Sequence, residues 1–502
     1  MNESPDYPFR QPAAFFPAGK QELIWGLPTL LCSWLVCNGV FFAGFHLGFA
    51  VFCGLGIVCS TLYLCRQGHR LTPYTATLLG LSLVICASFA RSDDTFVKFV
   101  MFCFLTFSTN LALCLLAGQN RRAPGSISSV WDVPRTVFLF GLGKLPAAFR
   151  GILQGFRGSG TMGKKSGAIL LGAVISLPLL AIVIPLLISA DAAFDALLQL
   201  LPDWDLLELL VSLFTGSCLA VFLYTRSTAL HHAPKAEPAR KAGRGIPVLT
   251  VNTVLTVIGI VYTAYLASQL AYFCGGFSGI LPEGFSLAEY ARRGFFELAW
   301  LCGINLCILA LGVGLVAKKD RAPLSTRLLC LFIGVATLFL VVSASAKMFL
   351  YIDAYGLTRL RVLTQVVIFF LGITTVLVCT WLFVPKLPYM KAVLVTALVI
   401  GAAVAWADVD TVVARYNVTA YQSGKLETID MAHLDSLGYS AAPYIALLKN
   451  EADPYVAETA REMLSHTYHD APEAFRGWNY VNHIAKEYFP LPGDLAIPKH
   501  EG

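Results

Sequence analysis

Long apolar stretches, separated by short polar segments, make up most of the chain. Each stretch approaches the roughly 20 apolar residues that a helix needs to cross the hydrocarbon core of a bilayer. Eleven spans are predicted in this way, at 23–43, 46–65, 74–90, 96–117, 167–189, 207–225, 247–273, 295–317, 328–346, 362–384 and 389–408. The pattern therefore predicts an all-α fold, a polytopic bundle of transmembrane helices.

The pattern changes after residue 410, where polar and apolar positions alternate with helical spacing. Turn residues divide this region, and helices are predicted to begin near Val412, around Tyr444, and at 453–467 and 475–489. The predicted organisation has three parts. They are a cytoplasmic N-terminal tail at 1–22, a multipass domain at 23–410 with a basic loop at 118–166, and an extracytoplasmic helical tail at 411–502.

Composition agrees with a membrane protein. Of the 502 residues, 56% are hydrophobic and only 14% are charged, whereas soluble domains carry about 25% charged residues. These values exclude a soluble enzyme, a disordered chain and a fibrous repeat. The 14 cysteines all lie before residue 380, mostly in apolar runs and without a CxxC pair. They are therefore interpreted as core residues, and neither a metal site nor a cofactor is predicted.

The distribution of basic residues predicts the orientation of the bundle. With a cytoplasmic N-terminus, the inner segments are 1–22, 66–73, 118–166, 226–246, 318–327 and 385–391. They hold 23 of the 30 Lys and Arg residues that precede the tail. Because basic residues concentrate in cytoplasmic loops, this bias favours an inside N-terminus, and eleven spans then place the C-terminus outside. It also accounts for the net charge of +6 without a nucleic-acid partner.

The inner loop 118–166 contains an amphipathic pattern. Its apolar residues recur at helical spacing, at Phe138, Leu142, Leu145, Phe149, Ile152 and Phe156. Arg135, Arg150 and Arg157 flank this face. One interpretation is a helix in the inner headgroup layer whose arginines contact anionic lipid. The other is a helix packed on the inner surface of the protein itself, and the sequence leaves both open.

Three motifs resemble catalytic or ligand-binding patterns without completing them. Residues 158–165 nearly match a phosphate loop, but Lys165 stands where Ser or Thr would hold magnesium. His466 and His469 share a helical spacing, without a second pair that would suggest a metal. Ser343 and Lys347 are four residues apart and could form a nucleophile and base. Each is better explained structurally, as a flexible loop, exposed histidines, and a packing serine beside a snorkelling lysine.

Charged residues near the outer ends of spans eight to ten form the strongest candidate site. Glu289, Arg293 and Glu297 are spaced by four residues and would line one helix face. Ionisable groups at such depth are costly, so they pair with one another or line a hydrated cavity. A structural ion-pair network and a site for a ligand or partner are both open. This outer-face polar cluster comprises Glu289, Arg292, Arg293, Glu297, Lys347, Tyr351, Asp353, Arg359 and Arg361.

Several stretches resemble a known bacterial family of multipass membrane proteins. They are the segments 268–272, 289–298, 351–361, 414–417, 423–426, 434–437 and 478–479. Together they are similar to a domain of unknown function, the type numbered 4153/4173, over about residues 165–490. The resemblance implies a bacterial integral membrane protein with a C-terminal helical segment. It implies no activity, cofactor or catalytic residue.

The sequence therefore favours an uncharacterised protein of the bacterial cytoplasmic (inner) membrane. The leading hypothesis is a non-enzymatic envelope protein that binds or senses an envelope protein or ligand at its outer face. Besides membrane lipid, anionic lipid at loop 118–166 is a further candidate partner. One alternative is a transporter of a small or lipid-like solute, suggested by Pro178 and Pro185 in span five. The other is an enzyme that acts on a lipid-linked substrate.

Overall fold

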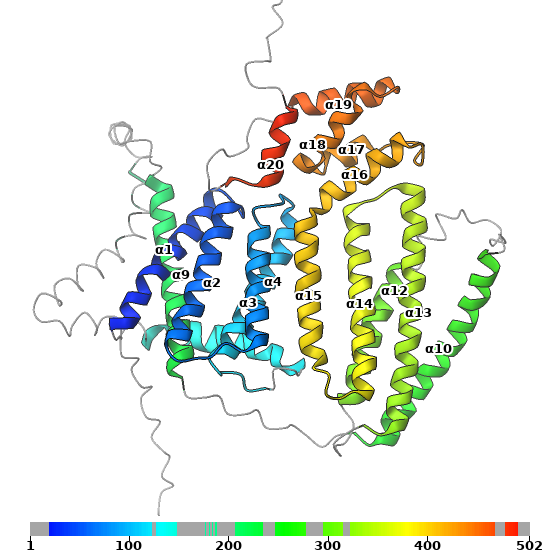
Figure 1. Cartoon of the computed structure of the whole chain (residues 1–502), viewed down its shortest axis with the longest axis horizontal. Helices are drawn as coiled ribbons and strands as arrows, with labels where there is room; N and C mark the ends of the chain where they lie inside the picture. Colours follow the sequence, from blue (N-terminus) through cyan, green and yellow to red (C-terminus); the bar gives the residue numbers. More distant parts are fainter. Residues whose placement is uncertain are drawn as a thin grey trace, which may run out of the picture. The chain divides into compact units, whose positions relative to one another are not determined.

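The computed structural model describes residues 20–122, 127–147, 206–233, 246–277, 295–314, 322–466 and 477–489, together with a few isolated residues between 176 and 187. Its regular elements are helices (Figure 1). The chain divides into two compact units. Unit 1 is Met1–Ala239 with Asp470–Tyr480, and unit 2 is Arg240–His469 with Val481–Gly502.

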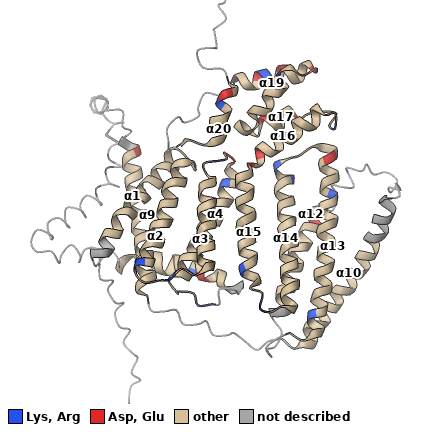
Figure 2. Ribbon diagram, viewed as in Figure 1, with Lys and Arg blue, Asp and Glu red and all other residues tan. Residues whose placement is uncertain are grey.

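The helices confirm the predicted fold class. Among the described residues, eight helices are long and apolar enough to cross a membrane, and two shorter apolar helices lie at Pro73–Ser88 and Glu297–Gly312. Figure 2 shows that Lys, Arg, Asp and Glu lie mainly near the ends of these helices. The predicted span 167–189, with Pro178 and Pro185, lies outside the described residues apart from isolated positions. The chain is a multipass, all-α membrane protein.

The main helices in the described part of unit 1 are α1 (Lys20–Phe42), α2 (Leu47–Arg66), α3 (Pro73–Ser88), α4 (Thr95–Leu116) and α9 (Leu206–His232). Polar side chains join α1 to α9, since Trp34 Nε1 donates to Ser212 Oγ over 3.1 Å and Asn38 Nδ2 donates to Glu208 Oε1 over 2.9 Å. Inside an apolar bundle, such bonds satisfy polar groups that lipid cannot.

A short irregular segment follows α4 and packs on α9. It consists of η1 (Ile127–Trp131), α5 (Asp132–Arg135) and the π-helical η2 (Thr136–Leu142). Gly141 permits the close approach, because a Cβ there would meet the Phe222 ring of α9. Asp132 and Thr136 face the protein and are buried, whereas the apolar side chains Trp131, Phe138, Leu139 and Leu142 are exposed. Of the predicted amphipathic face, Phe138 and Leu142 are therefore exposed and Leu145 is partly buried; Phe149, Ile152 and Phe156 lie outside the described residues.

Unit 2 contains α10 (Val248–Phe277), α12 (Phe295–Gly314), α13 (Leu324–Tyr355), α14 (Arg359–Phe383) and α15 (Tyr389–Ala407). A buried polar chain links three of these helices. Tyr262 of α10 donates to Asn305 Oδ1 of α12 over 2.5 Å, and Asn305 Nδ2 donates to Thr337 Oγ1 of α13 over 2.9 Å. Isolated polar residues within these spans thus serve helix packing.

The helix α13 corrects the predicted boundaries around span nine. The sequence placed Lys347 and Asp353 in a long loop between 346 and 362, but α13 continues to Tyr355 and α14 begins at Arg359. The connection is only three residues long. The last turns of α13 contain polar residues, because there the helix leaves the membrane and contacts the tail. A prediction from hydrophobicity therefore ended the span before the helix ends.

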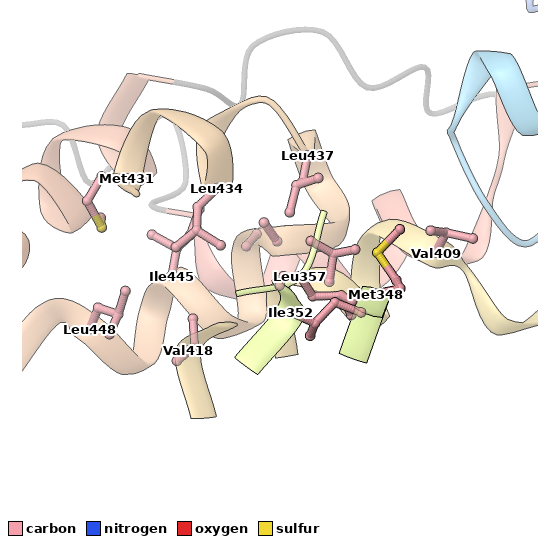
Figure 3. Packing of buried hydrophobic residues seen from close by; sticks show 14 of the residues in the cluster. Met348, Ile352, Leu357, Val409, Val418, Met431, Leu434, Leu437, Ile445 and Leu448 are labelled. Atoms are coloured by element: carbon pink, nitrogen blue, oxygen red, sulfur yellow. The ribbon is translucent and has the colours of Figure 1, made fainter. Parts of the chain in front are cut away.

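The tail forms a layer of short helices at the end of α15. They are α16 (Val409–Gln422), α17 (Met431–Asp435), η3 (Gly438–Ala441), α18 (Ala442–Ile445), η4 (Ala446–Asn450), α19 (Pro454–His466), α20 (Tyr480–Ala485) and η6 (Lys486–Tyr488). Within unit 2, one apolar cluster runs from Leu340 and Ile352 of α13 to Leu434 and Leu448 of the tail (Figure 3). The tail helices and the span ends of unit 2 therefore share a single core.

Candidate functional site

The α13–α14 connection is the structural centre of the candidate site. Gly356 ends α13 with φ +74° and ψ −176°, a conformation that is essentially open only to glycine. Thr358 then caps α14, since its side chain accepts from the Arg361 backbone N over 3.4 Å. This sharp reversal places the first residues of α14 directly beside the last turn of α13.

Arg361 holds the connection from the side of α14. Its Nη1 donates to the Tyr355 carbonyl over 3.1 Å and also to the Gly356 carbonyl. Its guanidinium lies 4.1 Å from the centre of the Tyr351 ring, a cation–π contact. Arg361 thus caps the carbonyl groups that α13 leaves without helical partners.

Asn417 of α16 joins the tail to the same connection. Its Oδ1 accepts from the Leu357 backbone N over 2.7 Å, and its Nδ2 donates to the Leu357 carbonyl over 2.8 Å. Both residues are buried. The amide therefore replaces, for one residue, the pair of backbone hydrogen bonds that a neighbouring strand would make. Asn417 also begins the triplet Asn417-Val418-Thr419, which matches the N-glycosylation pattern, but its burial makes the side chain inaccessible as an acceptor.

A charged pair makes the second link between the connection and the tail. Arg359 Nε donates to Asp410 Oδ1 and Arg359 Nη2 to Asp410 Oδ2, both over 2.7 Å. The Asp410 side chain is only 3% exposed, whereas that of Arg359 is 35% exposed. The two parallel hydrogen bonds neutralise the buried charge of Asp410 and also fix the relative orientation of the two side chains.

The break between α15 and α16 positions Asp410. Asp408 there has φ +51° and is buried. Its Oδ2 accepts from Ser440 Oγ over 3.0 Å and from Thr411 Oγ1. This carboxylate therefore fixes the bend at which the chain leaves the last span and begins the tail.

A third pair lies at the surface. Lys425 Nζ donates to Asp353 Oδ1 over 2.6 Å and to the Tyr416 hydroxyl over 3.4 Å. The hydrogen bond to Asp353 raises the pKa of Lys425 from its ordinary value, with a contribution from Tyr416. Both charged side chains are at least half exposed, so the pair contributes little to stability.

Glu297 and Lys347 complete the described part of the predicted outer-face polar cluster. Glu297 lies at the start of α12 and interacts electrostatically with Lys347 of α13. Ser343 Oγ is buried and has no hydrogen-bond partner among the described residues, so it is not bonded to Lys347. The contact between nucleophile and base that a serine–lysine pair requires is therefore absent from this arrangement.

Six of the nine predicted cluster residues fall in described segments: Glu297, Lys347, Tyr351, Asp353, Arg359 and Arg361. Glu289, Arg292 and Arg293 lie outside the described residues. The sequence did not identify the partners of Arg359 and Asp353, which are Asp410 and Lys425 of the tail. Asn417 and Lys425 lie in the segments 414–417 and 423–426, which carry the family resemblance. The resemblance could therefore have pointed to these two residues, although not to their partners.

Unit 1 contains a separate polar cluster around His46, the residue before α2. His46 Nδ1 lies 3.2 Å from Lys98 Nζ and 3.2 Å from Asn479 Nδ2. Because both partners are donors, Nδ1 is the acceptor and the proton sits on Nε2, which faces Asp93 Oδ1 at 3.8 Å. Burial, followed by the charge of Lys98, lowers the pKa of His46 to about 4.

The segment that carries Asn479 is bound through its backbone to the same end of unit 1. Leu47 N donates to the Trp478 carbonyl over 3.1 Å, and Tyr480 N donates to the Ala90 carbonyl over 2.9 Å. Arg91 lies 4.2 Å from the centre of the Tyr480 ring. The stretch 478–480 is therefore an integral part of unit 1.

Comparison with protein families identifies the chain. The model of a domain of unknown function (DUF4153) matches residues 75–448, well over half of the chain. The protein belongs to this family. The match begins at the third predicted span, so the family likeness extends further towards the N-terminus than the resemblance noted from the sequence. It covers α13, α14, the connection between them, and the tail residues Asp410, Asn417 and Lys425. No curated protein and no solved structure matches the chain.

Proposed function

We propose that this DUF4153 protein is a non-enzymatic protein of the bacterial cytoplasmic membrane that binds or senses an envelope component through its tail. The observation that carries the proposal is the double attachment of the tail to the α13–α14 connection. Asn417 binds Leu357 through both backbone groups, and Asp410 binds Arg359 through both carboxylate oxygens. A ligand that alters the tail would thus act on two membrane helices.

The charges of the attachment support a binding role over a catalytic one. Two pairs of charged groups at the attachment bind each other, Arg359 with Asp410 and Lys425 with Asp353. Paired, hydrogen-bonded carboxylates are poor candidates for general acids or bases, because the pairing stabilises the ionised form and disfavours proton transfer. The same contacts suit a device that must hold the tail in one position until a ligand shifts it.

The proposed orientation has a cytoplasmic N-terminus and an extracytoplasmic tail. It is supported by the 23 basic residues in the predicted inner segments, against seven in the outer ones. Fusion of alkaline phosphatase or a cytoplasmically folding fluorescent protein to the C-terminus tests this orientation. Phosphatase activity without fluorescence is expected, and the reverse result would place the tail in the cytoplasm.

Hydrogen exchange on the full-length protein in lipid nanodiscs tests the binding role. Soluble peptidoglycan fragments and a periplasmic extract are added separately. We expect saturable protection of tail amides in 409–466, together with a change in exchange at 356–361. Absence of protection, or protection of the tail without any change at the connection, would contradict the proposed coupling.

Two variants separate binding from coupling. Asp410→Asn removes the charge that holds Arg359 while keeping nearly the same shape, so tail protection should persist and the response at 356–361 should weaken. Lys425→Met removes an exposed pair on the same face and serves as the matched control. If both variants respond like the parent protein, the Arg359–Asp410 pair does not transmit binding.

A further inference from the structure

The segment 127–142 lies alongside the last turns of α9 rather than beyond the end of that helix. Gly141 of η2 is so close to α9 that a Cβ on the glycine would meet the ring of Phe222. Phe222 lies ten residues before the end of α9 at His232, which corresponds to about 15 Å along a helix. In Figure 1 the segment, drawn in cyan, crosses the lower ends of the unit 1 helices. It therefore lies at a depth that α9, a helix apolar enough to cross a membrane, still occupies.

One side of the segment is held by the protein. Asp132 is buried, and its Oδ2 accepts from the Arg122 backbone N over 3.2 Å. Arg135 Nη2 donates to the Gln119 carbonyl over 2.5 Å. Gln119 Nε2 in turn donates to two carbonyl groups at the end of α9, over 3.0 and 3.3 Å. These bonds attach the segment to the residues that follow α4 and, through them, to the last turn of α9.

The exposed side chains of the segment are largely apolar. Trp131 is 68% exposed, Phe138 60%, Leu139 57% and Leu142 49%. Contact between such side chains and water is unfavourable, and acyl chains beside a membrane helix would replace that contact. Tryptophan in particular is enriched at the boundary between acyl chains and headgroups. The exposed side of the segment therefore suits lipid.

Basic residues accompany this apolar surface. The described stretches 118–122 and 127–147 contain four basic residues and one acidic residue, Asp132, which is buried. Arg121, after α4, is exposed, and Lys144, after η2, is partly exposed. Because the next residue in the chain is bonded to Asp132, Arg121 lies beside α5. Apolar side chains together with accessible cations are the combination by which interfacial helices bind anionic lipid.

We propose that the segment 127–142 lies in the boundary layer between acyl chains and headgroups, where it binds anionic phospholipid. Its exposed aromatic and aliphatic side chains contact the acyl chains, and Arg121 and Lys144 bind the phosphate group. In phosphatidylcholine a quaternary ammonium group offsets the phosphate charge, whereas phosphatidylglycerol keeps its negative charge. The surface should therefore select phosphatidylglycerol. Of the two interpretations that the sequence left open, each then describes one side of the segment.

Photo-crosslinking of the full-length protein in lipid nanodiscs tests the proposal. p-Benzoylphenylalanine replaces Phe138 or, separately, Trp131, and the nanodiscs contain equal amounts of phosphatidylglycerol and phosphatidylcholine. Mass spectrometry of the adducts identifies what each position contacts. Phe369 of α14 is the matched control, because this aromatic residue of a membrane span has the same 60% exposure as Phe138. Tyr455 of the tail, at 69% exposure, is the control for a surface outside the spans.

We expect lipid adducts at Phe138, Trp131 and Phe369 and none at Tyr455. The ratio of phosphatidylglycerol to phosphatidylcholine adducts should be about fivefold higher at Phe138 than at Phe369, the enrichment that one basic residue near the surface provides. Peptide adducts in place of lipid at Phe138 and Trp131 would show that another part of the chain or a second copy covers the segment, and would overturn the proposal. Equal ratios at Phe138 and Phe369 would overturn the selection of anionic lipid.

Two double variants, both measured with the probe at Phe138, test the role of Arg121 and Lys144. Arg121→Gln with Lys144→Gln should lower the lipid ratio to the control value, while the total of lipid adducts persists because the apolar side chains are unchanged. Lys425→Gln with Arg461→Gln removes two exposed charges of the tail and should leave the ratio as it is. If both double variants lower the ratio equally, the net charge of the protein attracts the lipid and the proposal fails. A ratio that the first double variant does not change excludes Arg121 and Lys144 as the headgroup ligands.

Discussion

Arg359 and Asp410 lie 51 positions apart in the sequence and form two parallel hydrogen bonds of 2.7 Å. The pair joins the first turn of α14 to the first turn of α16, with the whole of α15 between them in the sequence. The exposure of the two side chains differs about tenfold, at 35% for Arg359 and 3% for Asp410. Replacing Arg359 and replacing Asp410 should therefore change the stability of the protein by different amounts.

Arg359→Met should destabilise the protein more than Asp410→Asn. The first change takes the charge and both hydrogen bonds of Arg359 from a buried carboxylate, whereas the second leaves an arginine that reaches water. Breaking a buried pair costs about 3–5 kcal/mol, and the partial exposure of Arg359 places Arg359→Met at the lower end, about 3 kcal/mol. Reversible unfolding in mixed detergent micelles measures both variants.

Lys425→Met is the matched control for this comparison, because it breaks an ion pair on the same face between two exposed side chains. Exposed pairs contribute little, so its unfolding curve should overlay that of the parent protein. Equal losses for Arg359→Met and Asp410→Asn would show that the burial of Asp410 does not determine the energetics.

Asn417→Ala should loosen the tail from the connection. It leaves the N–H and C=O groups of Leu357 buried without their partner, and each unsatisfied buried group costs about 1–3 kcal/mol. A loss of about 2 kcal/mol or more is expected, with faster hydrogen exchange at Leu357. Thr419→Ala, on the exposed side of α16, removes the glycosylation triplet without touching Leu357 and should change neither property.

Gly356→Ala should be more damaging than Gly424→Ala, although both glycines have positive φ. A Cβ at Gly356 would lie 2.6 Å from Asn417 Oδ1, whereas nothing lies within 4 Å at Gly424. Strain at such a backbone conformation costs about 1–3 kcal/mol, and the collision with Asn417 adds to it. Similar unfolding midpoints for the two variants would show that the contact with Asn417 does not matter.

Much of the fold followed from hydrophobic pattern alone, because a membrane-spanning helix must be long and apolar over nearly its full length. The predicted spans at 46–65, 96–117 and 389–408 lie within a residue or two of α2, α4 and α15. The pattern was less accurate where a helix continues beyond the hydrocarbon layer. There α9 reaches His232 through residues that the protein itself surrounds, and α13 reaches Tyr355 through a last turn in which Asp353 and Tyr355 are exposed.

The sequence predicted only one residue of each ion pair in the candidate site. Membrane physics singled out Arg359 and Asp353 because charges near a span are costly. The same argument could not identify their partners, Asp410 and Lys425 of the tail. These ion pairs form only because α16 and the residues after it pack against the α13–α14 connection. The end of the predicted span 207–225 was placed too early for a related reason, because Arg226 lies within α9, which continues to His232. A basic residue just after an apolar run looks like a loop residue until the packing of α5 and η2 on α9 is known.

The pH dependence of unit 1 follows from His46. Its folded-state pKa of about 4 lies below its ordinary value of 6.5, so between these values the unfolded chain binds more protons than the folded one. Stability therefore rises with pH through that window and is lost as pH falls from about 6.5 towards 4. Lys98 and Asn479 both donate to Nδ1, and a proton added there would displace them.

Lowering the pH from 7 to 4 should cost the full-length protein up to about 3 kcal/mol through His46, at 1.36 kcal/mol for each pKa unit. His46→Gln removes the titrating group, so its free energy of unfolding should fall less over the same range. His433→Gln is the matched control, because His433 lies in the tail, on α17, and should retain the parent slope. Parallel pH profiles for the parent and His46→Gln would mean that protonation at His46 is not what destabilises unit 1 in acid.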